Sequence, residues 1–208
     1  MKIPTETIPF DHPQAFQRAL DVINTGGVIA FPTDTVYGIG VSTFQERAIE
    51  KIYGVKGRSH LKAIPILIGD LEDMDQVTNP LTPTLKKIVR NFWPGALTLV
   101  LPRLPSLPGN LSPSPTIGVR NPDHQLMREL LRITGALAAT SANLSGEPSA
   151  LTAEEVLTQL DGKIDLILDG GNSPGGFAST VLDCTGGEPK ILREGPVTQE
   201  EIDRVVNG

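Results

Sequence analysis

The stretch Gly26–Thr35 reads GGVIAFPTDT and contains a complete change from helix to strand to turn. Its two glycines follow Pro13–Asn24, whose apolar residues recur at helical spacing, and glycines commonly end helices. Val28–Phe31 is a short, wholly apolar run, which is typical of a buried strand. Pro32 ends that run, and the polar turn Thr33–Thr35 follows it. A helix followed by a buried strand with polar groups at its end indicates an α/β domain.

Helices and strands alternate along most of the remaining chain. Helical periodicity predicts further helices at residues 45–53, 83–92, 122–134, 151–160 and 198–206. Short apolar runs predict strands at residues 64–68, 96–101, 116–120, 136–140, 164–168, 179–184 and 190–193. The last strands lie close together in sequence, so we expect a mixed sheet in one domain spanning 1–208. Pro102–Pro115 has five prolines and no periodicity, which predicts an irregular loop serving as a lid or a rim.

The charge balance argues against binding to nucleic acid by bulk electrostatics. The 208 residues include 18 Lys and Arg against 24 Asp and Glu, a formal net charge of -6. Nucleic-acid binding usually requires an excess of basic charge, so any RNA contact would need a local basic patch. One cluster, residues 51–62, holds five basic side chains counting His60, and on charge alone it could be only a solvated face.

The single cysteine, Cys184, excludes an internal disulfide and lies in an apolar run, so we expect a small, buried strand residue. The N-terminal segment lacks the apolar core of a signal peptide. No run approaches the ~20 apolar residues that a membrane span needs. The sequence therefore predicts a soluble, cytoplasmic protein that does not enter a membrane.

Two short polar segments, Lys56–Arg58 (KGR) and Ser141–Asn143 (SAN), are the strongest candidates for a binding site. The first supplies two cations on a segment that we expect to be extended, so that both would point the same way with Gly57 allowing close approach. The second supplies a hydroxyl and an amide after Thr140. Ligands of α/β sheets bind where strand ends converge, and Arg120 and Arg193 also end predicted strands. Together these groups predict an anion site for a phosphate-bearing ligand.

The motifs of several familiar catalytic sites are missing. The sequence contains no G-x-x-x-x-G-K-[ST] loop and no G-x-S-x-G turn around Ser141. His12, His60 and His124 lack the spacing of zinc ligands. We therefore expect any chemistry to depend on orientation and charge stabilisation, with no covalent or acid–base catalytic residue assigned.

Six segments, in this order, resemble the YrdC-like threonylcarbamoyl-AMP synthase family in its single-domain form. The resemblance covers about residues 13–195, and the combination is far more specific than any one segment. The segments are Gly26–Gly38, Lys56–Arg58, Trp93–Gly95, Gly118–Arg120, Thr140–Gly146 and Arg193–Gly195.

This resemblance implies an L-threonylcarbamoyladenylate synthase, a nucleotidyltransferase that uses L-threonine, bicarbonate and ATP and releases pyrophosphate. A separate transferase would then modify the adenosine beside the anticodon of tRNA. The family's fold is a twisted sheet of parallel and antiparallel strands with flanking helices and a basic concave cavity. Mg²⁺ is expected to arrive with ATP, held largely by phosphate and water, and its protein ligands stay unassigned.

The resemblance also implies roles for individual residues. The expected ATP-binding residues are Lys56, Arg58, Lys62, Thr116, Ser141, Asn143 and Arg193. The expected threonine-binding residues are Thr35, Arg120, Thr140 and Ser179. A guanidinium such as that of Arg120 can pair bidentately with the carboxylate of an amino acid.

The chain departs from the family pattern at two positions. Ser59 stands where many members have proline, and Leu67 stands near the position at which some members place a histidine against threonine. Two alternatives stay open: an RNA-binding module that uses the same basic cavity, with weak RNA binding, and a paralogue without synthase activity. In paralogues of this kind the lysine of the first segment or the asparagine of the second can be replaced. This chain keeps both, as Lys56 and Asn143, which counts against the paralogue.

Overall fold

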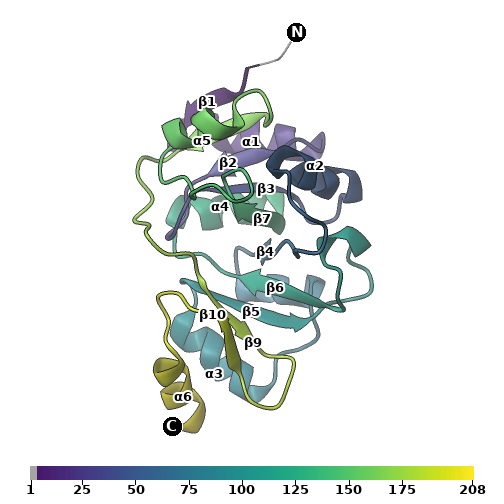
Figure 1. Ribbon diagram of the computed structural model, residues 1–208, viewed down its shortest axis with the longest axis vertical. Coiled ribbons are helices and arrows are strands. Elements are labelled where there is room, and N and C mark those ends of the chain that lie inside the picture. Colours follow the sequence, from purple (N-terminus) through teal and green to yellow (C-terminus); the bar gives the residue numbers. More distant parts are fainter. Residues whose placement is uncertain (1–3) are drawn as a thin grey trace.

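A computed structural model describes residues 4–208 and shows one continuous sheet of ten strands (Figure 1). Their order across the sheet is β1-β8-β2-β3-β7-β4-β6-β5-β9-β10. The strands are β1 (Glu6–Pro9), β2 (Ile29–Phe31), β3 (Gly38–Ser42), β4 (Ile66–Leu67), β5 (Leu97–Pro102), β6 (Thr116–Arg120), β7 (Leu137–Ser141), β8 (Leu166–Asp169), β9 (Thr180–Asp183) and β10 (Lys190–Arg193). The sheet contains both parallel pairs, such as β1 with β8 and β5 with β9, and antiparallel pairs, such as β3 with β7, which confirms the predicted mixed sheet.

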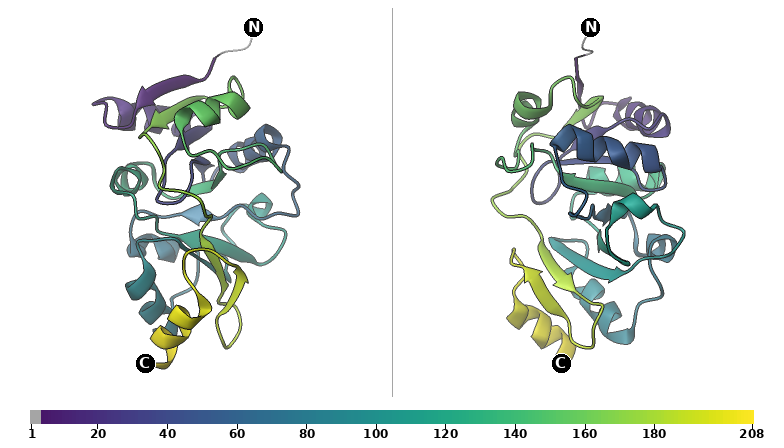
Figure 2. Two further views of the ribbon diagram at one scale, coloured as in Figure 1. Left: turned by 60° about the vertical axis from the view of Figure 1, so that its left-hand side comes forward. Right: turned by 45° about the vertical axis from the view of Figure 1, so that its right-hand side comes forward.

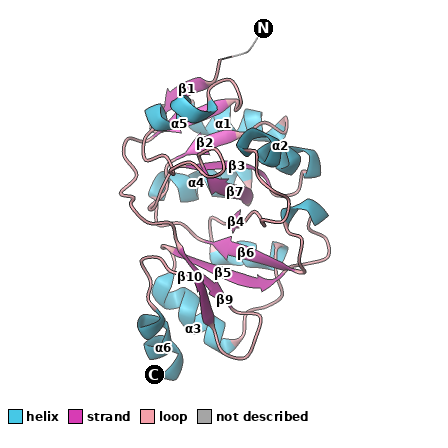
Figure 3. Ribbon diagram, viewed as in Figure 1, coloured by secondary structure: helices cyan, strands magenta, loops and turns pink. Residues whose placement is uncertain are grey.

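Helices flank the sheet on both sides (Figure 3). They are α1 (Ala15–Asn24), α2 (Glu46–Lys56), α3 (Pro83–Phe92), α4 (Gln125–Thr134), α5 (Ala153–Leu160) and α6 (Gln199–Asn207). The alternation of side chains along β2 divides the core, because Ile29 and Phe31 pack with the apolar stripes of α1 and α4. Ala30 faces the larger cluster, which includes buried residues of α2, α3 and α5. None of these helices is both long and apolar enough to cross a membrane.

Strands β5, β9 and β10 lie at one edge of the sheet and have their own helical cover. Helices α3 and α6 pack together beside this part of the sheet, as both views of Figure 2 show. On β5, Leu97 and Leu99 are buried in the cluster that contains α3. Thr98 and Val100, which alternate with them, line a cavity. One face of this segment therefore carries the core and the other carries the candidate site.

Two strands were not predicted from the sequence. Strand β3 reads GIGVS, and glycine is depleted in strands, so the segment lacks a strand-like composition. The structure shows why glycine is needed: a Cβ on Gly38 or on Gly40 would lie 2.9 Å from the ring of Phe31 on β2. The second, β1, is an edge strand paired only with β8. Its four residues, ETIP, contain no apolar run from which a strand could be predicted.

Helix α2 extends further than expected and changes the geometry of the KGR segment. Lys56 is its last residue, and Gly57 follows in the left-handed conformation with φ 58°. The Gly57 N–H donates to the Gly54 carbonyl and the Arg58 N–H to the Tyr53 carbonyl, which is the Schellman pattern of a helix end. The prediction that Lys56 and Arg58 share an extended segment and point the same way is therefore wrong.

The proline-rich segment, residues 102–115, is irregular as predicted, apart from a short 3₁₀ helix at Gly109–Leu111. It is held in place by Leu107 and Leu111, which are buried in the main core. The Tyr53 hydroxyl of α2 also donates to the Asn110 carbonyl at 2.8 Å. These contacts fix the segment against α2 as a packed rim, and the lid interpretation is not supported.

Candidate active site

A cavity of about 410 Å³ lies where the ends of β2, β6 and β7 meet the start of β9. Its floor is formed by alternate side chains of β5 and β6 and by Pro65 and Leu67 at β4. The structure brings seven of the eleven predicted site residues to its lining: Thr35, Arg58, Arg120, Thr140, Ser141, Ser179 and Arg193. The charged side chains among the described lining residues are the three arginines, of which Arg120 is paired with Asp34.

Arg120 is the most deeply buried charge in the cavity, at 6% exposure. Its Nη2 donates to Asp34 Oδ1 at 2.6 Å, its Nη1 to Thr35 Oγ1 at 3.0 Å and its Nε to the Gly95 carbonyl at 3.0 Å. Burial lowers its pKa, while the charge of Asp34 opposes that shift. Three of its five N–H groups are thus used by the protein, which leaves two for a ligand.

Ser179 and Arg193 form a second polar group at the start of β9. Arg193 Nη2 donates to the Ser179 carbonyl at 2.7 Å and, at 3.3 Å, to the Ser179 hydroxyl. That hydroxyl also lies 2.8 Å from the hydroxyl of Thr98 on β5. Partial burial of its guanidinium and then the nearby charge of Arg120 lower the pKa of Arg193. Two like charges therefore face the same cavity, which favours an anionic occupant.

Arg58 enters the cavity from the loop after α2. Its Nε donates to the Lys62 carbonyl at 3.2 Å and its Nη2 to the Ala63 carbonyl at 2.8 Å. Its Nη1 has no hydrogen-bond partner within residues 4–208, so it can donate to a ligand. Burial lowers the pKa of Arg58.

Lys56 does not line this cavity, although its sequence neighbour Arg58 does. Its ammonium is buried and donates to the main-chain carbonyls of Ser141 and Asn143, and to Asn143 Oδ1 at 3.3 Å. An ammonium has three donors, and the last residue of β7 and the loop after it use all of them. Burial and the charge of Arg58 lower the pKa of Lys56 to about 8. Lys56 thus holds the Ser141–Asn143 loop from behind.

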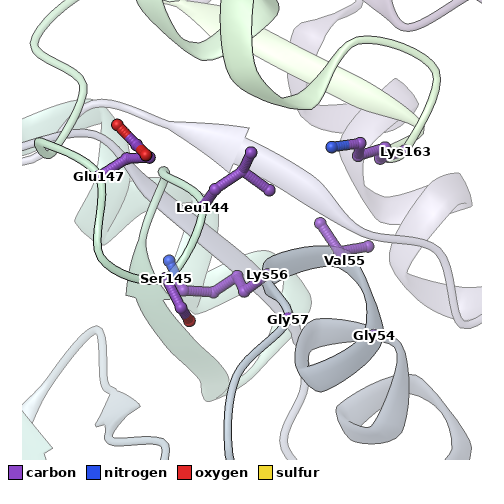
Figure 4. A pocket seen from close by; sticks show the side chains of 8 residues that line it. All are labelled: Gly54, Val55, Lys56, Gly57, Leu144, Ser145, Glu147 and Lys163. Atoms are coloured by element: carbon purple, nitrogen blue, oxygen red, sulfur yellow. The ribbon is translucent and has the colours of Figure 1, made fainter.

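Asn143 is also committed to the loop. Its Nδ2 donates to the carbonyls of Leu144 at 2.8 Å and Glu147 at 2.7 Å. Behind it lies a wider, shallow depression of about 710 Å³, lined by the end of α2 and by Leu144, Ser145, Glu147 and Lys163. Figure 4 shows the Lys56 side chain running from α2 toward Ser145 in this region. The cavity's arginines do not take part in it.

The last two predicted residues, Lys62 and Thr116, lie outside the cavity lining. Lys62 is exposed on the loop that also carries Arg58. Thr116 begins β6, and its hydroxyl lies 2.8 Å from that of Ser114.

Two residues that contribute to the site were not assigned from the sequence. Asp34 pairs with Arg120, and its place in the polar turn after β2 was the available signal. Thr98 lies within an apolar strand, and nothing in the sequence distinguishes its hydroxyl from that of any strand threonine. The residues 4–208 contain no cluster of three or more His, Cys, Asp or Glu suited to a metal ion.

Comparison with known proteins agrees with the resemblance seen in the sequence. A Sua5/YciO/YrdC family model, described as "Telomere recombination", matches residues 21–195. Threonylcarbamoyl-AMP synthase from Bacillus subtilis (strain 168) is 41% identical over 97% of this chain, which spans 59% of that protein's length. A putative threonylcarbamoyl-AMP synthase from Mycobacterium tuberculosis (strain CDC 1551 / Oshkosh) is 36% identical, with 97% of this chain and 95% of the relative covered.

A solved structure supports the same assignment. The crystal structure of P. abyssi Sua5 complexed with L-threonine superposes with a TM-score of 0.91 at 34% identity, covering 97% of this chain and 60% of that one. The match of the family model over most of the chain and the shared fold show that this chain belongs to the Sua5/YciO/YrdC family.

Proposed function

We propose that this protein is an L-threonylcarbamoyladenylate synthase, which forms threonylcarbamoyl-AMP and pyrophosphate from L-threonine, bicarbonate and ATP. The observation that carries the proposal is the convergence of Arg58, Arg120 and Arg193 with the hydroxyls of Thr35, Thr140 and Ser179 in one cavity. Relatives named threonylcarbamoyl-AMP synthase and a related structure with bound L-threonine support it.

We divide the polar groups of the cavity between the two substrates. We assign L-threonine to the part of the cavity around Arg120, where Thr35, Thr140 and Ser179 supply hydroxyls and Arg120 retains two N–H groups for the carboxylate. The ATP phosphates would lie toward Arg58, Ser141 and Arg193, and the nucleoside would reach Lys62 and Thr116 outside the cavity. In this arrangement Lys56 and Asn143 act on ATP indirectly, by holding the loop that presents Ser141.

The reaction joins threonine, as its N-carboxylate, to the α-phosphorus of ATP, with pyrophosphate leaving. Negative charge accumulates on the phosphoryl oxygens during such a displacement, and fixed cations stabilise it. The arginines of the cavity supply the stabilising positive charge, and no covalent intermediate is needed. The preformed wall of the cavity orients both substrates. With this chemistry the enzyme would be a nucleotidyltransferase.

Mg²⁺ would enter the site with ATP. The described lining residues are hydroxyls, arginines and apolar groups, whereas Mg²⁺ prefers carboxylate, phosphate and water oxygens. The ion would therefore be held by the ATP phosphates and water, where it neutralises phosphate charge. The product would pass to a separate transferase that modifies tRNA.

The deciding experiment incubates purified protein with ATP, Mg²⁺, bicarbonate and either L-threonine or L-serine, and measures the adenylate and pyrophosphate. We expect product with threonine, dependence on bicarbonate, and less product with serine. A control variant, Lys163→Met, alters an exposed lysine outside the cavity and should retain activity.

Absence of product from the wild-type protein, while a known active synthase forms it under the same conditions, would overturn the proposal. Direct binding of tRNA in that case, with an affinity that falls steeply with salt, would instead support an RNA-binding module.

A further inference from the structure

We propose that Thr98, on β5, is a positioning residue that fixes the direction in which the Ser179 hydroxyl donates to L-threonine. The inference rests on the proposed function, in which Ser179 contacts this substrate. It starts from the two hydroxyls themselves, which lie 2.8 Å apart and belong to residues exposed by only 4% and 6%.

The rotamer of Thr98 is held by its surroundings. Thr98 lines the floor of the cavity together with Gly118 on the neighbouring strand β6. A Cβ on Gly118 would lie 3.1 Å from Thr98 Cγ2, so the absence of a side chain at Gly118 makes room for that methyl group. Because a β-branched side chain has few χ1 options, seating the methyl group beside Gly118 directs the hydroxyl toward Ser179.

The hydrogen-bond pattern around Ser179 then sets the direction of its own proton. Arg193 Nη2 can only donate, so the Ser179 oxygen accepts at 3.3 Å from that side. If the Thr98 hydroxyl donates as well, both acceptor positions of the Ser179 oxygen are filled. The Ser179 proton is then available to the cavity, which suits a carboxylate or a hydroxyl oxygen of the substrate.

The sheet makes this contact rigid. Strands β5 and β9 pair in parallel, with Leu97 opposite Thr180 and Thr98 opposite Val181. The Thr180 N–H also donates to the Ala96 carbonyl at 2.9 Å, directly beside Ser179. Thr98 thus transmits the fixed geometry of the sheet to a serine that precedes the first residue of β9.

The test compares Thr98→Val, which keeps shape but removes the hydroxyl, with Thr98→Ser, which keeps the hydroxyl. We expect Thr98→Val to raise KM for L-threonine roughly 3- to 10-fold, the effect of losing one hydrogen bond, with KM for ATP unchanged. Thr98→Ser should stay within about 2-fold of wild type. Thr78→Val is the matched control, because Thr78 is equally buried but its hydroxyl donates to the Pro102 carbonyl, outside the cavity lining.

A double-mutant cycle shows whether Thr98 acts through Ser179. In a Ser179→Ala background, Thr98→Val should have no further effect on KM for threonine. An additive effect, an equal rise in both KM values, or a Thr98→Ser variant as impaired as Thr98→Val would each overturn the inference. Affinity for L-threonine is measured in parallel by calorimetry without ATP, so a wild-type protein that binds threonine but forms no adenylate would refute the proposed function and still test Thr98.

Discussion

The ammonium group of Lys56 donates to both oxygens of Asn143, the main-chain carbonyl and Oδ1. The two residues are 87 positions apart in the chain, and both are buried. The contact joins the end of α2 to the loop after β7, so the two polar segments that stand out in the sequence are parts of one structural unit. Arg58 and Ser141 then face the cavity from this unit.

Replacing Lys56 by methionine should destabilise the protein. The carbonyls of Ser141 and Asn143 would lose their buried donor, which costs about 1–3 kcal/mol in the free energy of unfolding. Urea denaturation measures this change. Lys62→Met serves as the control, since Lys62 is exposed and its loss should alter stability by less than about 0.5 kcal/mol. If Lys56→Met is as stable as the wild-type protein but has a much higher KM for ATP, Lys56 contacts the phosphates directly.

The protonation of Lys56 predicts a pH dependence. Its pKa is lowered by burial and by Arg58 from 10.5 to about 8. Above about pH 8 the amine loses one donor, so kcat/KM for ATP should decline as the loop loosens. Stability should change in the other direction. Between about pH 8 and 10.5 the unfolded chain binds this proton more tightly than the folded protein does, so the free energy of unfolding should rise with pH across that window.

Lys56→Arg is the control for this pH effect, because arginine keeps its proton throughout the window. Its pH profile for ATP should lack the decline. A decline of the same size in Lys56→Arg would assign the titration to another group.

Breaking the pair between Arg120 and Asp34 should cost both stability and threonine binding. The two side chains are 8% and 13% exposed, and removal of one partner leaves a largely buried charge. Arg120→Met should therefore lower the free energy of unfolding by about 3–5 kcal/mol, as measured by urea denaturation. Asp34→Asn keeps an acceptor for Arg120 Nη2, so we expect a smaller loss of stability and a moderate rise in KM for threonine. Equal stability of Arg120→Met and wild type would contradict the buried-pair interpretation.

The helix end at Gly57 should tolerate asparagine better than alanine. A Cβ at this position meets nothing within 4 Å, so the cost comes only from the left-handed backbone at φ 58°. Gly57→Ala should lose about 1–2 kcal/mol, and Gly57→Asn less, because asparagine enters this conformation more readily. Thermal unfolding compares the two variants, and identical transitions would show that the backbone conformation at Gly57 does not limit stability.

Most elements could be predicted because their local signals agree with the tertiary structure. Pro83 is the first residue of α3, and Thr198 caps the N-terminus of α6, so both helices begin where the sequence predicts. Strand β3 could not be predicted, because its glycines are explained only by the ring of Phe31 on the neighbouring strand. The expectation that Cys184 is a buried strand residue is wrong, because β9 ends at Asp183 and Cys184 is only partly buried.

The sequence by itself determined the mixed α/β sheet, since this depends on periodicity and turn chemistry, and it indicated an anion site at the KGR and SAN segments. The family resemblance supplied the individual roles of the site residues. Only the tertiary structure decided how those residues are used. It placed Arg58, Arg120 and Arg193 in the cavity, and it buried Lys56 and Asn143 behind it. The physical reason is that donors and acceptors far apart in the chain compete for the same partners, and packing selects which pairs form. Thr98 and Ser179, 81 residues apart, are one such pair.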